Sequence, residues 1–138
     1  MTFTVYGQPA PQGSKRHVGH GVMIESSKAV KPWRTAVEQC VLLAAPFGTR
    51  PYPILIRGPV ELFVTFTFQR PKTAKKSVVH KTSTPDLSKL VRSTEDALTT
   101  AGVWEDDSRV VRCYAEKLYT GHPDAMPVPG AVIRVEPA

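Results

Sequence analysis

The residues best suited to chemistry lie in the segment 85–107, which combines carboxylates with basic side chains. With about 100° between successive helical residues, three of them share one helix face: Ser88, Arg92 and Glu95. Asp86 lies where this helix would begin, and Asp106 and Asp107 form an acidic turn after it. Each feature also has a purely structural interpretation, because carboxylates favour helix entrances and exposed turns.

A run of cations precedes these carboxylates. The segment 70–81 contains no acid, and the whole chain has a net charge of +6 and a pI near 9.6. Basic side chains hold phosphates and carboxylates hold a metal, so the two together indicate a metal-using nuclease. We therefore predict contacts to the DNA backbone by these residues: Lys15, Arg16, Arg70, Lys72, Lys75, Lys76 and Lys81. The alternative for the segment 70–81 is a solvated loop.

The spacing of these residues resembles the RusA-like family of Holliday junction resolvases. The family pattern DLDNLxK…DAL…GxxxDDxxV stands here as Asp86-Leu87-Ser88-Lys89-Leu90, Arg92, Asp96-Ala97-Leu98, Gly102, Asp106-Asp107 and Val110. The proline-rich opening, PAPQGSKR over residues 9–16, also fits the family. The resemblance covers roughly the whole chain and is strongest from Pro85 to Lys117.

The resemblance implies roles for individual residues. Asp86 is similar to the family's first metal-binding aspartate, Asp107 to the catalytic aspartate of the paired motif, and Asp106 to its neighbour. Arg92 stands where the family usually has an essential lysine, and Lys117 matches a basic position on the following strand. The implied catalytic residues are Asp86, Asp107, Arg92 and Lys117.

The same resemblance implies an activity and its partners. We expect an endodeoxyribonuclease that resolves Holliday junctions by paired symmetric nicks, in DNA recombination, repair or phage DNA processing. Mg²⁺ is the expected cofactor, with Mn²⁺ as a substitute, and the partners are a branched, four-way DNA junction and a second copy of the chain in a homodimer. Two nicks require two sites, which a closed twofold dimer supplies. We expect a bacterial or phage-encoded protein of the cytoplasm, associated with the nucleoid and not with a membrane.

One position departs from the family pattern. Ser88 replaces a second aspartate, and Lys89 replaces an asparagine. A serine hydroxyl is uncharged and a poor ligand for Mg²⁺. Glu95 lies on the same face about 10 Å further along the helix, within reach of a metal held between the helix and the acidic turn. The alternatives are a surface glutamate and, for the whole chain, a branched-DNA-binding protein that cuts weakly. With Glu95 included, the predicted metal ligands are Asp86, Asp107, Asp106 and Glu95.

Hydrophobic periodicity predicts a single α+β domain over residues 1–138, with one mixed sheet and two main helices packed on it. Strands are expected over 2–6, 60–68 and 131–135, and a strand or hairpin over 109–119. One helix should begin at Pro32, because proline suits a first helical position. The other should have Thr84 as its cap, Pro85 in its first turn and Gly102 at its end.

Other features are less specific. The apolar runs are too short to span a membrane, and no export signal is visible. Cys40 and Cys113 have no metal-binding spacing, and we expect both to be buried and reduced. The dimer surface is expected to include apolar residues of the proline-rich segment 51–59.

A second alternative function for the whole chain is the binding of single-stranded nucleic acid. Such a protein would stack bases on three strand aromatics: Phe63, Phe66 and Phe68. Alternation favours core packing for Phe66 and Phe68.

Overall fold

The structure, a computed structural model, describes residues 1–13, 15–17, 23–25, 28–44 and 56–138. The strands are β1 (Thr2–Tyr6), β2 (Lys15–His17), β3 (Met23–Glu25), β4 (Val60–Phe68), β5 (Val110–Tyr119) and β6 (Gly130–Pro137). The helices are α1 (Val30–Ala44) and α2 (Leu87–Thr100), with a short 3₁₀ helix, η1 (Asp107–Arg109), before β5. The predicted α+β class, with two main helices and a mixed sheet, is confirmed.

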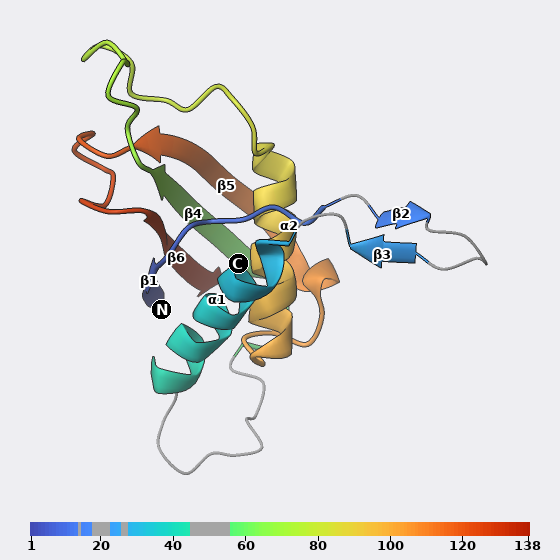
Figure 1. Cartoon of the computed structure of the whole chain (residues 1–138). Coiled ribbons are helices and arrows are strands. Elements are labelled where there is room, and N and C mark those ends of the chain that lie inside the picture. The colour runs from blue at the N-terminus through green and yellow to red at the C-terminus, as the bar shows by residue number, and fades with distance from the viewer. Residues whose placement is uncertain (14, 18–22, 26–27, 45–55) are drawn as a thin grey trace.

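Four strands form the main sheet in the order β1-β6-β4-β5. β6 is antiparallel to both β1 and β4, whereas β4 and β5 are parallel and are joined through α2. Residues 110–119 form a single strand that pairs with β4, so the segment 109–119 contains one strand and no hairpin. The parallel neighbours β4 and β5 need a long crossover, which α2 supplies. β2 and β3 form a separate antiparallel pair. Both helices cover the same face of the main sheet (Figure 1).

The core lies between this covered face and the two helices. β4 contributes alternate residues and both helices contribute a stripe: Val60, Leu62, Val64, Phe66 and Phe68, then Trp33, Val37, Val41, Leu90 and Leu98. The Trp33 and Phe66 ring centroids are 6.4 Å apart, and the Trp33 indole N–H donates to the Thr94 hydroxyl at 3.1 Å. Full burial of each large side chain contributes about 1.5–3 kcal/mol. Phe66 and Phe68 are consequently unavailable for stacking on bases.

Proline and glycine lie near the helix ends, as the sequence predicted, but α1 starts earlier. It begins at Val30, so that Pro32 falls within its first turn, where a missing N–H removes no helical hydrogen bond. Gly102 directly follows the C-cap of α2 and has φ +83°, a left-handed conformation that glycine adopts without strain. The predicted stop at Gly102 is confirmed.

The N-terminus of α2 differs from the prediction. Asp86, and not Thr84, occupies the cap position, and Pro85 lies outside the helix. The backbone of Asp86 is extended, with φ −67° and ψ 135°. The segment before it is tied to β5, because the Lys117 ammonium group donates to the carbonyl oxygen of Pro85 at 2.7 Å. The Leu90 N–H donates to the Asp86 carbonyl at 3.1 Å, and the helix begins at Leu87.

The opposite face of the sheet carries neither helix (Figure 1). On it Phe63 stacks on Tyr114, with ring centroids 5.1 Å apart and planes 12° from parallel. The Arg134 guanidinium lies 3.8 Å from the Phe63 ring centroid. These three side chains form a row across β6, β4 and β5. The row ends at Tyr114, which is 57% exposed because β5 is the edge strand.

Candidate active site

A groove of about 610 Å³ runs between α2 and β5. Its walls include the helix face that periodicity predicted, and they are formed by seven side chains: Leu87, Ser88, Val91, Arg92, Glu95, Cys113 and Ala115. Cys113 is exposed and Cys40 is half-buried, so the prediction that both cysteines are buried is wrong. Cys113 is exposed because it lies on an edge strand, where fewer neighbours cover a side chain.

Asp86 lies at the N-terminus of α2, directly before the groove residues Leu87 and Ser88. Its carboxylate is exposed and makes no capping hydrogen bond, although it occupies the cap position; the Lys89 ammonium group lies 3.8 Å away. Lys117 donates to two carbonyl oxygens of the segment before Asp86, at 2.9 and 2.7 Å. Burial and nearby Lys81 lower the pKa of Lys117, and Asp86 counteracts them. Lys117 therefore fixes the turn that carries Asp86.

Asp107 lies beside the C-terminus of α2, next to Glu95 of the groove wall. Its carboxylate accepts hydrogen bonds from the Thr99 hydroxyl and from the Trp104 indole N–H, the latter at 3.4 Å. The same indole N–H lies 2.6 Å from the Thr99 hydroxyl oxygen, and Trp104 is fully buried. Packing and hydrogen bonds thus hold the Asp107 carboxylate in place. Asp107 is therefore not simply an exposed turn residue, which was the structural alternative for the acidic turn.

Two carboxylates of α2, Glu95 and Asp96, adjoin Asp107 and form an acidic cluster with it. Burial, followed by the charges of Asp107 and Asp96, raises the pKa of Glu95 to about 7, while Arg92 counteracts the rise. Burial and a hydrogen bond with Asp107 also raise the pKa of Asp96, against the charges of Arg34 and Arg92. Negative charge in this acidic cluster is therefore only partly compensated by the protein.

Within one chain, Asp86 and Asp107 do not come together. Thr99, which contacts Asp107, is 13 positions after Asp86, which corresponds to about 20 Å along α2. The two ends of α2 are seen in Figure 1. Ligand oxygens lie about 2.1 Å from Mg²⁺, so one ion cannot bind both carboxylates of a single chain. The structure does bring Asp107 and Glu95 together, which are two of the four predicted ligands.

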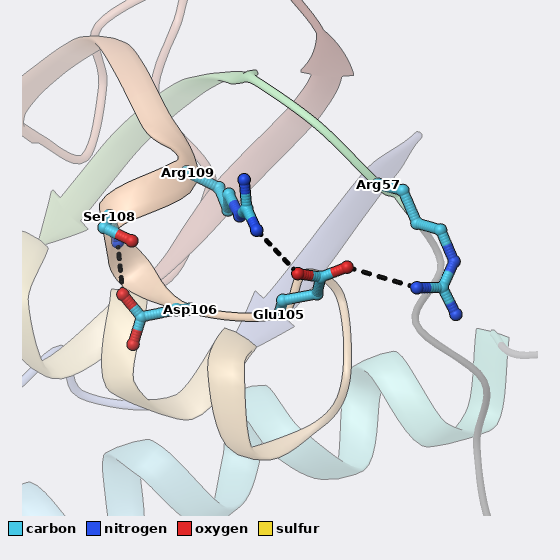
Figure 2. A network of polar contacts seen from close by, with 5 residues as sticks. All are labelled: Arg57, Glu105, Asp106, Ser108 and Arg109. Carbon is cyan, nitrogen blue, oxygen red and sulfur yellow. Dashed lines mark hydrogen bonds and ion pairs between the residues drawn. The ribbon is translucent and has the colours of Figure 1, made fainter.

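Asp106 acts as a turn cap. Its exposed carboxylate accepts a hydrogen bond from the Ser108 backbone N–H at 2.9 Å, which lowers the pKa of Asp106 (Figure 2). Neighbouring Glu105 binds Arg57 at 3.1 Å and Arg109 at 2.8 Å (Figure 2). These contacts fix the start of η1 and β5, as the structural interpretation of an acidic turn predicted.

The segment between β4 and α2 presents three of the predicted DNA-binding residues. Lys72, Lys75 and Lys76 are exposed on it. Arg70 behaves differently, because its guanidinium donates to the backbone carbonyls of Val78, at 2.7 Å, and of Lys75. Arg70 therefore stabilises the conformation of the loop that carries the three lysines.

Three predicted DNA-binding residues remain. Lys81 has contacts within the protein, and the side chains of the other two lie outside the part of the chain that the structure describes. The Lys81 ammonium group donates to the Ser83 hydroxyl at 2.9 Å and lies 5.2 and 5.9 Å from two aromatic ring centroids. The side chains of Lys15 and Arg16 are outside the described part of the chain, although their backbone forms β2.

The sequence interpretation assigned no role to Asp96 or Arg34. Asp96 belongs to the Asp-Ala-Leu motif, which was a usable signal, whereas the approach of Arg34 to Asp96 depends on how α1 packs against α2.

Among the described residues, no three His, Cys, Asp or Glu side chains form a ready-made metal site. An ion here would need water and phosphate oxygens as well, which is usual for Mg²⁺. No helix of the described residues is long and apolar enough to cross a membrane.

The sequence suggested the segment 51–59 for the surface of a dimer. Residues 51–55 of that segment lie outside the described residues. Ile56 is 7% exposed, packs in the core of its own chain, and donates its backbone N–H to the Val103 carbonyl at 2.9 Å. Its side chain is therefore not available to a second copy.

Comparison with known proteins identifies a matching family and a similar protein. The family described as endodeoxyribonuclease RusA matches residues 6–126. The "Uncharacterized protein YqaN" of Bacillus subtilis (strain 168) is 32% identical over 134 residues, which cover 89% of this chain and 90% of that protein. The family match includes the groove and the residues beside it, from Asp86 to Lys117.

Proposed function

Since this chain belongs to the RusA endodeoxyribonuclease family, we propose that it resolves four-way DNA junctions by paired nicks, as a Mg²⁺-dependent homodimer. The observation that carries this proposal is the acidic cluster of Glu95, Asp96 and Asp107 beside Arg92 in the groove. A metal and a guanidinium in one groove suit the cleavage of a phosphodiester, whose transition state gains negative charge. Such an activity serves DNA recombination, repair or phage DNA processing.

The chemistry of the acidic cluster fits Mg²⁺. Its donors are carboxylate oxygens, which Mg²⁺ prefers. Burial, and after it the neighbouring carboxylates, raise the pKa of both Glu95 and Asp96. A divalent cation, Mg²⁺ or Mn²⁺, would relieve this repulsion. We assign Asp107 and Glu95 of one chain as ligands. When bound, the ion supplies an activated water and compensates charge on the phosphate.

The cations of the groove have separate roles in this proposal. A guanidinium grips phosphate through two donors, so Arg92 acts as an electrostatic clamp and not as a general acid. Lys117 acts as a positioning residue, because its ammonium group is occupied by the carbonyl oxygens before Asp86. Lys72, Lys75 and Lys76, the exposed lysines of the segment 70–81, bind the DNA backbone without recognising bases.

The substitution Asp107→Asn tests the proposal on a synthetic four-way junction and a linear duplex, with and without Mg²⁺. Wild type should nick the junction only with the metal. Asp107→Asn should lower the nicking rate by about 100-fold or more, because a metal contributes several kcal/mol to the transition state. Junction binding should persist or tighten, since the substitution removes a negative charge near phosphate. Asp124→Asn, an exposed carboxylate between β5 and β6, is the charge-matched control and should nick normally.

Nicking by Asp107→Asn at nearly the wild-type rate would exclude Asp107 as a ligand. The same assay examines a second candidate function, a branched-DNA-binding protein that cuts weakly. This candidate is favoured by Ser88, which gives the groove wall a hydroxyl where the family pattern has a carboxylate. It predicts tight binding of the junction by wild type without nicks in either Mg²⁺ or Mn²⁺.

A further inference from the structure

Two threonines of α2 each accept a hydrogen bond from a tryptophan, and the first pair is completed by the helix itself. The Trp33 indole N–H donates to the Thr94 hydroxyl at 3.1 Å, and that hydroxyl donates to the Leu90 carbonyl at 2.9 Å. A bond to the carbonyl four residues earlier is common for a threonine in a helix. This pair therefore joins α1 to α2 and satisfies its own polar groups inside the core.

The second pair directs its hydroxyl away from the helix. The Trp104 indole nitrogen lies 2.6 Å from the Thr99 hydroxyl oxygen. An indole N–H only donates, so the hydroxyl accepts this bond and has one proton of its own to donate. That proton goes to Oδ1 of Asp107. The result is a directed chain of hydrogen bonds from indole to hydroxyl to carboxylate, which we call the Trp104–Thr99 relay.

The starting point of the relay is held by packing and by backbone hydrogen bonds. Trp104 is fully buried in the core. In the turn before it, the Gly102 N–H donates to the Thr99 carbonyl and the Val103 N–H to the Leu98 carbonyl, both at 3.0 Å. The indole therefore has a fixed orientation, and its N–H fixes the direction of the Thr99 hydroxyl.

The relay ends in the acidic cluster. Thr99 lies four residues after Glu95, on the same side of α2, and so extends the helix face that lines the groove. The half-buried Asp107 accepts the Thr99 hydroxyl and, at 3.4 Å, the Trp104 N–H through the same oxygen, Oδ1. Neither bond uses Oδ2. The relay therefore restrains rotation of the carboxylate and leaves its second oxygen to contacts within the acidic cluster.

The two pairs differ in a way that packing does not require. The Leu90 carbonyl is enough to satisfy the buried Thr94 hydroxyl on the same helix. At Thr99 the hydroxyl is instead aimed at a carboxylate whose neighbours are also carboxylates. Two donors on one oxygen give Asp107 a fixed orientation among groups that repel it.

We propose that Trp104 and Thr99 are positioning residues of the active site, which orient Asp107 as a metal ligand. The indole N–H sets the direction of the Thr99 hydroxyl, and the hydroxyl holds Oδ1, so that Oδ2 is the oxygen presented to the ion. Removing an outer partner of this kind typically weakens metal binding by about 10–100-fold. The inference rests on the proposed function, in which Asp107 binds the metal.

The substitution Thr99→Val tests the relay, because it replaces the hydroxyl by a methyl group of similar size. The affinity of the DNA-free variant for Mn²⁺, measured from the EPR signal of free Mn²⁺, should fall by about 10-fold or more. Thr99→Ser restores the hydroxyl and should recover most of the affinity. Trp104→Phe keeps a buried ring without its N–H and should lower the affinity by about 3-fold or more, since the second donor remains.

Thr94→Val is the matched control. It removes the hydroxyl of the other pair on the same helix and leaves the Trp33 indole without its partner, so it should also destabilise the protein. Its affinity for Mn²⁺ should equal that of wild type, because the Thr94 hydroxyl donates to a backbone carbonyl. Urea unfolding of both valine variants establishes that each is folded under the conditions of the binding measurement.

Nicking of a four-way junction gives a second measurement, in which phosphate can complete the metal site. The Mn²⁺ concentration for half the maximal rate should rise by about 10-fold or more in Thr99→Val. The same concentration should not change in Thr94→Val. This measurement decides the matter if the DNA-free protein binds Mn²⁺ too weakly for EPR.

An unchanged Mn²⁺ requirement in Thr99→Val overturns the relay. So does an equal loss in both valine variants, because it would reflect stability alone. If Thr99→Val does not fold, an unchanged Mn²⁺ requirement in Trp104→Phe overturns the relay instead. Wild type that neither binds Mn²⁺ nor nicks with it counts against the proposed function as well, whereas active wild type beside an unaffected Thr99→Val overturns this inference alone.

Discussion

The charge of Glu95 should make the stability of the protein depend on pH. Its pKa, raised from 4.5 to about 7, means that the folded chain holds this proton more tightly than the unfolded chain. The stabilisation is complete below pH 4.5 and is lost as the pH rises through about 7. Glu95→Gln removes this pH dependence, because a neutral amide replaces the carboxylate among Asp96 and Asp107.

The magnitude follows from the same values. A rise from 4.5 to about 7 corresponds to about 3 kcal/mol, and screening of a half-buried side chain reduces the expected effect to about 1–2 kcal/mol. At about pH 8 the Glu95→Gln variant should therefore be more stable than wild type by this amount, and at about pH 4 the two should be equal. Urea unfolding of both proteins across this range, without divalent metal, measures the difference.

Two further measurements make the test specific to the acidic cluster. Adding Mg²⁺ at high pH should stabilise wild type more than Glu95→Gln, because the ion compensates the carboxylate that the variant lacks. Asp106→Asn should behave oppositely to Glu95→Gln, because its carboxylate has a lowered pKa in the folded chain and stabilises it when ionised. Identical pH profiles for wild type and Glu95→Gln would show that Glu95 does not couple folding to pH.

Assays on DNA examine the groove and the basic segment 70–81. Neutralising Lys75 and Lys76 together should weaken binding to every DNA shape and reduce the slope of log affinity against log salt by about 1 for each phosphate that the variant no longer binds. An unchanged slope would leave these lysines as a solvated surface. Glu95→Gln should slow junction nicking by about 10-fold or more, and adding Ser88→Asp should restore part of the rate by returning a carboxylate to the groove. Normal nicking by Glu95→Gln would show that Glu95 binds no essential metal.

The elements and the groove wall could be predicted because they depend on local periodicity. Alternation along the segment 60–68 identified the buried face of β4, and helical spacing placed Ser88, Arg92 and Glu95 on the face that lines the groove. Gly102 also ended its helix as predicted, since its backbone conformation is nearly specific to glycine.

The grouping of the carboxylates could not be predicted from spacing. Asp86 and Asp107 belong to one motif, but α2 separates them because β5 begins beside the C-terminus of the helix. That placement depends on the parallel pairing of β4 and β5, which residue spacing left undecided. The contacts of Arg70 were equally inaccessible, since a guanidinium on a basic loop binds phosphate or loop carbonyls with the same donors.

The position of β6 affects when the protein can fold during synthesis. β6 is last along the chain, yet it lies inside the sheet between β1 and β4, and Ala131, Ile133 and Val135 are fully buried. The ribosome delivers β4, α2 and β5 before the strand that connects them to β1. Until residues 130–137 have left the exit tunnel, one edge of β4 lacks its partner and the apolar core stays open. Folding of this domain is therefore completed only after β6 emerges, and until then the exposed apolar surface and the unpaired edge of β4 favour aggregation.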